Sequence, residues 1–330
     1  MSRSIPIAIV LAMLSGCITL PHDVAGELEP AAHDRQDHFR KSHRTFDAES
    51  ANEGELDFHG LPLQSGQLVV SDSGEADSLL TTMLGEEYTA YGHAGILSIE
   101  GGKAYVYEGY ASLWPFLSGP PTDAMHGGIR RVTLEQYIKR QRVTAIFDAG
   151  AGVDKAAVAA FARARHDDRT EFDPYFDWSD HTRLYCTEFA ALALNAGGRP
   201  LPKPVRVRDN PSMRVALNWL KVRAPEIVTA GSLTDGAERI ALISRTLTAR
   251  EVEAYFAAKR ELHRRFTEDQ KLGNIWSWSS WRGLQLRPQV AAFLEASSLW
   301  PHETASDLAD EWLGVFVQAD SRWSKLHTGG

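Results

Sequence analysis

Cys186 and His93 are the two residues whose chemistry stands out in this chain. The sequence contains two cysteines, Cys17 and Cys186. A thiolate is a strong nucleophile, and an imidazole beside it can take the thiol proton and later protonate a leaving amine or alcohol. A single reactive cysteine with a histidine elsewhere in the chain is typical of such a pair. The pattern indicates acyl transfer through a thioester.

The segment around Cys186 predicts a helix that begins at this cysteine. The apolar run of residues 186–195 is followed by Gly197-Gly198 and Pro200, which end a helix. The free N–H groups and the dipole at a helix start favour a thiolate. The same N–H groups can stabilise the oxyanion of a tetrahedral intermediate.

His93 is the preferred base, and Glu108 is the preferred partner of its imidazole. His93 opens a predicted strand over 93–99, and Glu108 lies on a returning strand over 104–109. Gly101-Gly102 between them is a hairpin signal. Pairing around this turn brings the two side chains close together, so the carboxylate can orient the imidazole.

Three further residues are expected to line the site, namely Tyr91, Tyr185 and Glu188. Glu188 has a second interpretation, as an acidic residue that the helix dipole favours in the first turn. His126 and His181 compete with His93 for the role of the base. Cys186 could also be a small buried apolar residue, because free cysteines are often buried.

No cofactor or metal ion is expected. His93, Glu108 and Cys186 could ligate zinc, but no pair among them has the short spacing of common zinc sites. The net charge of −8 at pH 7 argues against a nucleic-acid partner, which usually requires a basic face.

The first residues resemble an export signal. Residues 5–14 are apolar but too few to span a bilayer, and they lead into Leu14-Ser15-Gly16-Cys17, which resembles a bacterial lipobox. We therefore expect a signal peptide over 1–17 and lipid attachment at Cys17, which would anchor the chain to a membrane surface. By resemblance to Gram-negative sorting, Ile18 favours an outer-membrane lipoprotein that faces the periplasm. An ordinary secretory signal with an incidental cysteine is the alternative.

The remaining chain divides into three expected parts: a polar, flexible tether over 18–58, a catalytic domain over 59–232 and a helical extension over 233–330. The domain contains short strands with short connections, which favours antiparallel pairing, followed by segments of helical period. The fold class is therefore α+β. Trp276, Trp278 and Trp281 in the extension are interpreted as packing anchors, with a glycan- or lipid-contacting surface as the alternative.

At these residues the chain resembles the permuted papain-like amidases of the YiiX/YaeF type, within the NlpC-type superfamily of cysteine hydrolases. The resemblance rests on 66–70, 91–96, 106–109 and the stretch from Phe172 to Phe189. The order histidine, acidic residue, cysteine is the permuted one. The resemblance implies a papain-like core with an antiparallel sheet against the cysteine helix, with Cys186 as nucleophile, His93 as base and Glu108 as the orienting residue. Gln67 and Thr187 depart from the Gly-Asp and Cys-Ser-Glu often present in the family.

These observations predict a lipid-anchored thiol amidase or peptidase, with cell-wall peptide as the first substrate expected from location and superfamily. A related alternative is a thioesterase, phospholipase or acyltransferase that acts on an acyl-lipid substrate. A long apolar channel near Cys186 would favour lipid, and a polar open groove would favour peptide. The other alternative is an envelope protein that binds a partner without catalysis.

Overall fold

The computed structural model describes residues 54–58, 60–111, 127–209, 213–214, 217–218, 222–269, 275–279, 283–299, 304–307 and 309 of the 330-residue chain. Its centre is a six-stranded sheet in the order β10-β7-β3-β4-β5-β6, and every neighbouring pair is antiparallel. The strands of this sheet are β3 (Leu68–Asp72), β4 (His93–Glu100), β5 (Lys103–Ala111), β6 (Gly127–Thr133), β7 (Val143–Phe147) and β10 (Arg239–Ile243). The protein is thus a mixed α+β fold, as the sequence predicted.

In the described part of the chain, helices and three two-stranded sheets surround the central sheet. The helices are α1 (Ala76–Leu84), α2 (Leu134–Lys139), α3 (Lys155–Asp167), α4 (Cys186–Ala196), α6 (Ala230–Thr234), α7 (Ala249–Asp269) and α8 (Pro288–Leu299). The paired strands outside the sheet are β1 (Glu55–Phe58) with β2 (Leu61–Gln64), β8 (Val205–Arg206) with β9 (Glu226–Ile227), and β11 (Trp276–Ser279) with β12 (Gly283–Leu286).

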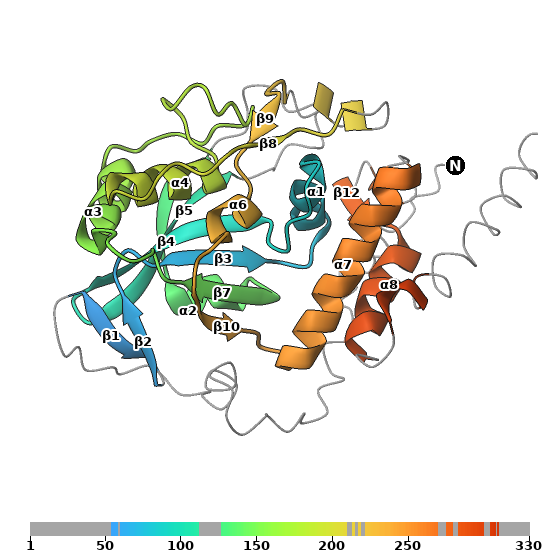
Figure 1. Ribbon diagram of the computed structural model, residues 1–330, viewed down its shortest axis with the longest axis horizontal. Coiled ribbons are helices and arrows are strands. Elements are labelled where there is room, and N and C mark those ends of the chain that lie inside the picture. The colour runs from blue at the N-terminus through green and yellow to red at the C-terminus, as the bar shows by residue number, and fades with distance from the viewer. Residues whose placement is uncertain are drawn as a thin grey trace, which may run out of the picture.

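The sheet separates two apolar cores because successive side chains of a strand point to opposite faces. On β3, Leu68 and Val70 belong to the larger core, which contains α4 and α7 residues, whereas Val69 belongs to the smaller one. The smaller core is closed by α2 and the β1–β2 hairpin. Figure 1 shows α3 and α4 on one side of the sheet and α2 on the other. Helix α4 packs directly on β4 and β5.

The β4–β5 hairpin has the predicted turn. Gly101 and Gly102 both have positive φ, at 55° and 74°, which suits a two-residue turn between Glu100 and Lys103. This turn fixes the pairing along the hairpin, so that Gly95 lies opposite Glu108. A Cβ at position 95 would lie 2.6 Å from the carbonyl oxygen of Tyr107, so the close approach of the strands requires glycine there.

Two expected boundaries need correction. The tether was expected to run to residue 58, but Glu55–Phe58 forms β1 and pairs with β2. The extension was expected to be helical from residue 233, but Arg239–Ile243 forms the edge strand β10 of the main sheet. β1 pairs with the adjacent β2, and its Leu56 and Phe58 side chains are buried in the smaller core. β10 pairs with β7, which is distant in the chain, and a local pattern does not reveal such a partner. The predicted signal peptide, Cys17 and residues 18–53 lie outside the described residues.

The C-terminal helices are part of the same packed body. Helices α7 and α8 lie side by side next to α1 and β12 (Figure 1). The buried ammonium of Lys259 on α7 donates hydrogen bonds to Asp72 at the end of β3 and to the carbonyl oxygen of Ala90 (2.7 Å). Trp276 is buried and donates to the carbonyl oxygen of Ala76 (3.1 Å), which confirms its interpretation as a packing anchor. Among the described residues, no helix is long and apolar enough to cross a membrane.

Candidate active site

The carboxylate of Glu108 lies at the centre of a buried polar cluster on β5. Its side chain is 1% exposed, and one oxygen accepts a hydrogen bond from His93 Nε2 at 2.6 Å. Its other oxygen accepts from Arg130 Nε and Arg140 Nη2, both at 2.8 Å. Three positively charged hydrogen-bond donors therefore hold this carboxylate in one position.

The hairpin register explains how His93 reaches Glu108. Glu108 is directly opposite Gly95, and His93 lies two residues before Gly95, on the same face of β4. The pair is therefore a diagonal cross-strand pair, which long side chains can span. Because Gly95 has no side chain, nothing stands between the imidazole and the carboxylate at this position. The His93 ring also stacks on Tyr137 of α2, with ring centroids 6.1 Å apart and planes at 26°.

Cys186 is the first residue of α4, as predicted. It is 8% exposed, and the His93 imidazole and the backbone N–H groups of Ala94 and Thr187 interact with its thiol. Gly109 permits the close packing of Cys186, because a Cβ at position 109 would lie 3.1 Å from both the Cα and the nitrogen of Cys186. The structure thus brings Cys186 next to His93, whose imidazole is hydrogen-bonded to Glu108.

The pKa values of this chain favour an ion pair. Burial raises the pKa of Cys186. Its interactions with His93 and with the two backbone N–H groups together lower this pKa by more than burial raises it, so the net shift is downward. Burial lowers the pKa of His93, but Cys186 and then Glu108 raise it to about 10. Burial raises the pKa of Glu108, but His93 and the two arginines lower it to about 2. These shifts favour the thiolate of Cys186, the imidazolium of His93 and the carboxylate of Glu108 over their uncharged forms.

The three residues expected to line the site have different positions. Tyr91 borders a cavity at Cys186. Tyr185 is the residue before α4, and its hydroxyl accepts a hydrogen bond from the backbone N–H of Val228 at 3.0 Å. Glu188 is buried, accepts from the backbone N–H of Tyr185 (3.3 Å) and pairs with His181 Nδ1 (2.7 Å). Tyr185 and Glu188 therefore support the start of the helix and are not among the residues that border this cavity.

Glu188 is uncharged at neutral pH. Burial, followed by the negative charges of Asp173, Asp177 and Asp180, raises its pKa to about 9. His181, the competing base, contacts this carboxyl group, and the groups that shift the pKa of Cys186 include His93 but not His181. The other competitor, His126, lies outside the described residues.

Sequence reasoning missed Arg130, Arg140 and Tyr137. Arg130 is the cross-strand partner of Glu108 on β6, and Arg140 follows α2. Neither position has a distinctive spacing from Glu108 in the sequence. A predicted register for β5 with β6 is the signal that could have identified Arg130.

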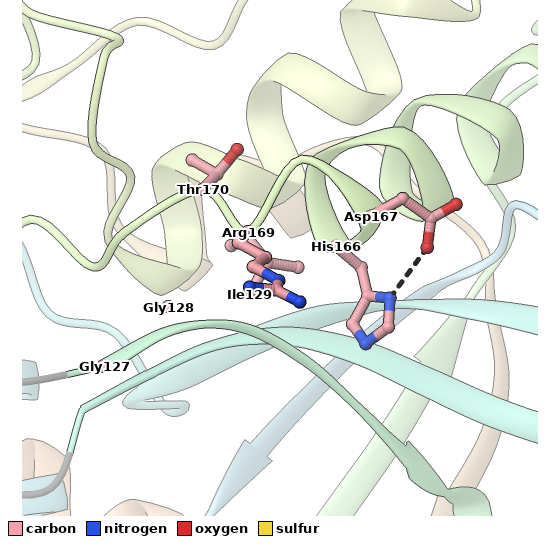
Figure 2. Close-up of a pocket in the computed structure, with 7 residues that line it drawn as sticks. All are labelled: Gly127, Gly128, Ile129, His166, Asp167, Arg169 and Thr170. Carbon is pink, nitrogen blue, oxygen red and sulfur yellow. Dashed lines mark hydrogen bonds and ion pairs between the residues drawn. The ribbon is translucent and has the colours of Figure 1, made fainter.

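A larger pocket of about 460 Å³ lies between the start of β6 and the end of α3 (Figure 2). Its border includes Gly127, His166 and Arg169, and His166 Nδ1 pairs with Asp167 at 3.1 Å. None of its bordering residues is shared with the cavity at Cys186. This pocket is therefore separate from the cluster of Cys186, His93 and Glu108.

Comparisons with known proteins give one structural likeness. No protein-family profile and no curated protein matches the sequence. The chain is similar to a solved structure described as metalloprotein yiiX from Escherichia coli O157:H7, with 18% sequence identity and a TM-score of 0.39. The likeness covers 52% of this chain and 92% of the yiiX chain.

The word metalloprotein in that description prompts a test of the residues present here. In the part of the chain that the structure describes, no group of three or more His, Cys, Asp or Glu side chains is arranged to hold a metal ion. The imidazole Nε2 and one carboxylate oxygen of the His93–Glu108 pair bond each other, and the second oxygen is occupied by two arginines. The donor set at Cys186 therefore does not fit a metal site.

Proposed function

We propose that this protein is a cysteine hydrolase of the amidase or peptidase type, with Cys186 as nucleophile, His93 as acid and base, and Glu108 as the residue that orients His93. The observation that carries the proposal is the placement of Cys186, at the start of a helix, next to the His93 imidazole, which is itself hydrogen-bonded to Glu108 at 2.6 Å. A structural cysteine in an apolar core would have a raised pKa and no such partner.

In the proposed reaction, the thiolate of Cys186 attacks the carbonyl carbon of an amide. Backbone N–H groups at the start of α4 are placed to stabilise the developing oxyanion. The His93 imidazolium then donates its proton to the leaving amine, and a thioester remains on the sulfur. Water next attacks the thioester while His93 takes its proton, and the acid product leaves with the thiolate–imidazolium pair restored. Glu108 keeps the imidazole oriented throughout.

The proposed fold is the circularly permuted papain-like core, in which the histidine strand precedes the cysteine helix. The order of His93, Glu108 and Cys186 along the chain and the packing of α4 on β4 and β5 support this assignment. We also propose lipid attachment at Cys17 and a location in the cell envelope, at the outer membrane facing the periplasm. These last proposals depend on residues 1–18 alone, namely the apolar segment 5–14, the lipobox-like Leu14-Ser15-Gly16-Cys17 and Ile18.

Cell-wall peptide is the proposed substrate, because it is an amide polymer of the proposed compartment. The cavity at Cys186 has a volume of only about 30 Å³. This volume argues against the alternative lipid substrate, because a long acyl chain needs a long apolar channel beside the sulfur.

The test compares the full chain with its Cys186→Ala and His93→Ala variants on digested cell wall and on a phospholipid panel, with products identified by mass spectrometry. We expect product from cell-wall peptide with the wild type and none with either variant. His166→Ala is the matched control, because His166 lies at the separate pocket, and it should retain activity.

Product that persists in Cys186→Ala would refute the thiol mechanism. Absence of product with every substrate, together with failure of a thiol-directed probe to label Cys186, would instead favour a protein that binds a partner without catalysis. Labelling that is abolished by His93→Ala would count against that second class.

A further inference from the structure

The small cavity at Cys186 has a defined border. It is formed by Thr81 and Leu84 of α1, the segment 89–92 that leads to His93, Phe176, the start of α4, and residues 227–230 between β9 and α6. The nucleophilic residue itself is part of this border. A group bound in this cavity would therefore lie next to the sulfur.

The border of this cavity is chemically apolar. Apart from the Cys186 thiol itself, it contains no acidic or basic group of Asp, Glu, His, Lys or Arg. Three of its four threonine hydroxyls already donate within the chain: Thr81 to the carbonyl oxygen of Ser78 (2.8 Å), Thr89 to that of Tyr91 (3.1 Å) and Thr187 to that of Val228 (2.7 Å). The fourth, that of Thr229, is hydrogen-bonded to the Ser232 hydroxyl (3.3 Å). Because these protons are occupied, a charged or strongly hydrogen-bonding group would lose its hydration without replacement, at a cost of about 1–3 kcal/mol or more.

The size of the cavity limits the group it can accept. Its volume is about 30 Å³. One water needs roughly 10–15 Å³ on this measure, so the cavity holds on the order of two or three non-hydrogen atoms. Leu84 and Ile227 border it, and both are buried in the larger core. An uncharged aliphatic group of two or three carbons therefore fits, and a long chain does not.

We infer that this cavity is the acyl pocket of the enzyme and that it selects short, uncharged aliphatic acyl groups, with Ile227 as a residue that sets the length limit. The inference depends on the proposed function and specifies its substrate class. In the acylation step the C–N or C–O bond of the substrate breaks, the acyl group moves to the sulfur, and the His93 proton leaves with the amine or alcohol. The short group next to the carbonyl carbon occupies the cavity during this step. An alanyl residue and a short fatty acyl chain share this chemistry.

The test uses p-nitrophenyl esters with the full chain, and intact mass identifies the acyl group on Cys186. One pair compares butyrate with octanoate, and a second compares N-acetylalanine with N-acetylphenylalanine, so that fatty and peptide sources are distinguished. We expect the shorter member of each pair to acylate at least about tenfold faster, in line with the discrimination that a hydrophobic pocket provides per methylene group. The short ester that acylates Cys186 faster, butyrate or N-acetylalanine, identifies the source.

A matched pair of variants tests the role of the pocket. Ile227→Ala should raise the rate with octanoate relative to butyrate by about tenfold. Ile243→Ala removes the same atoms from the smaller core on the other side of the sheet and should leave this ratio unchanged. If both variants lose stability, the ratio of the octanoate rate to the butyrate rate still reports the size limit of the pocket, because both rates are measured on the same variant.

Two outcomes separate the inference from the function on which it depends. Equal acylation by butyrate and octanoate, or an unchanged ratio in Ile227→Ala, would overturn the acyl pocket and leave the cysteine hydrolase intact. Absence of acylation by all four esters, with Cys186 still reactive toward iodoacetamide, would overturn the proposed function and the pocket with it.

Discussion

Replacing Glu108 with glutamine should lower the pKa of His93 without greatly changing the shape of the site. Glutamine keeps the size of the side chain but removes the charge that the imidazolium contacts at 2.6 Å. The pKa of His93 is raised from 6.5 to about 10 by Cys186 first and Glu108 second, against the opposing effect of burial. A hydrogen bond to a charged group contributes about 1.5–3 kcal/mol. Since one pKa unit corresponds to about 1.4 kcal/mol, we expect a decrease of about 1–2 units.

The assay is the titration of the His93 ring, followed by NMR in protein with isotopically labelled histidine and assigned with a His93→Gln variant. Catalysis should report the same change. The alkaline limb of the pH–rate profile, where the imidazolium loses the proton it gives to the leaving group, should move down by about 1–2 units. Cys186 and His93 titrate as a coupled pair, so the measured pKa values describe the pair and not either residue alone.

Glu100→Gln is the matched control. Glu100 ends the same strand that His93 begins, and its carboxylate pairs with Arg131, at 2.8 Å, instead of with the imidazole. This variant should leave the His93 titration in place. An unchanged His93 midpoint in Glu108→Gln, or an equal shift in Glu100→Gln, would refute the reasoning that the Glu108 charge sustains the imidazolium.

Two further predictions concern the packing of α7. His263 is buried beside Arg208, and burial followed by that charge lowers its pKa to about 4, so the folded state binds its proton less readily than the unfolded state. The stability that this group contributes is therefore complete above pH 6.5 and is lost toward pH 4. Urea unfolding should show that the free energy of unfolding falls by about 2 kcal/mol between pH 7 and pH 5, and His263→Gln should remove this pH dependence. An equal fall in His263→Gln would contradict the assignment of the pH dependence to His263. Lys259→Met leaves the buried Asp72 carboxylate without its countercharge, with Tyr255 and the backbone N–H of Gly74 as its remaining donors among the described residues, so the free energy of unfolding should fall by about 3–5 kcal/mol. Adding Asp72→Asn should recover part of this loss, and a double variant no more stable than Lys259→Met would show that the charge is not the cause.

The position of α7 explains why the C-terminal part of the chain matters to the site. Tyr88 donates to the backbone carbonyl of Phe256 at 2.9 Å, and the Phe256 ring contacts Tyr91 at a centroid distance of 5.1 Å. Together with the hydrogen bond from Lys259 to the carbonyl oxygen of Ala90, these contacts hold the segment that leads directly into His93. The extension therefore supports the strand that begins at His93. Its sequence alone predicted a separate helical part and did not indicate this contact.

The sequence by itself determined the features that depend on neighbours along the chain. Gly101-Gly102 specifies a tight turn, and the alternation along the two strands then places His93 and Glu108 on one face. The start of α4 at Cys186 follows from the apolar run and the glycines after it. These local rules are short-ranged, and for that reason they can be applied without knowing the fold.

Only the tertiary structure decided which distant groups surround these residues. Arg130 binds Glu108 because β6 pairs with β5, and Arg140 binds it because α2 directly follows β6. Strand β10 joins the sheet because β7 has an edge that no other strand of the described chain pairs with. The volume beside Cys186 depends on α1 and residues 227–230, which come from opposite ends of the domain. Such contacts arise from close packing between segments far apart in the chain, and no local pattern of residue types records them.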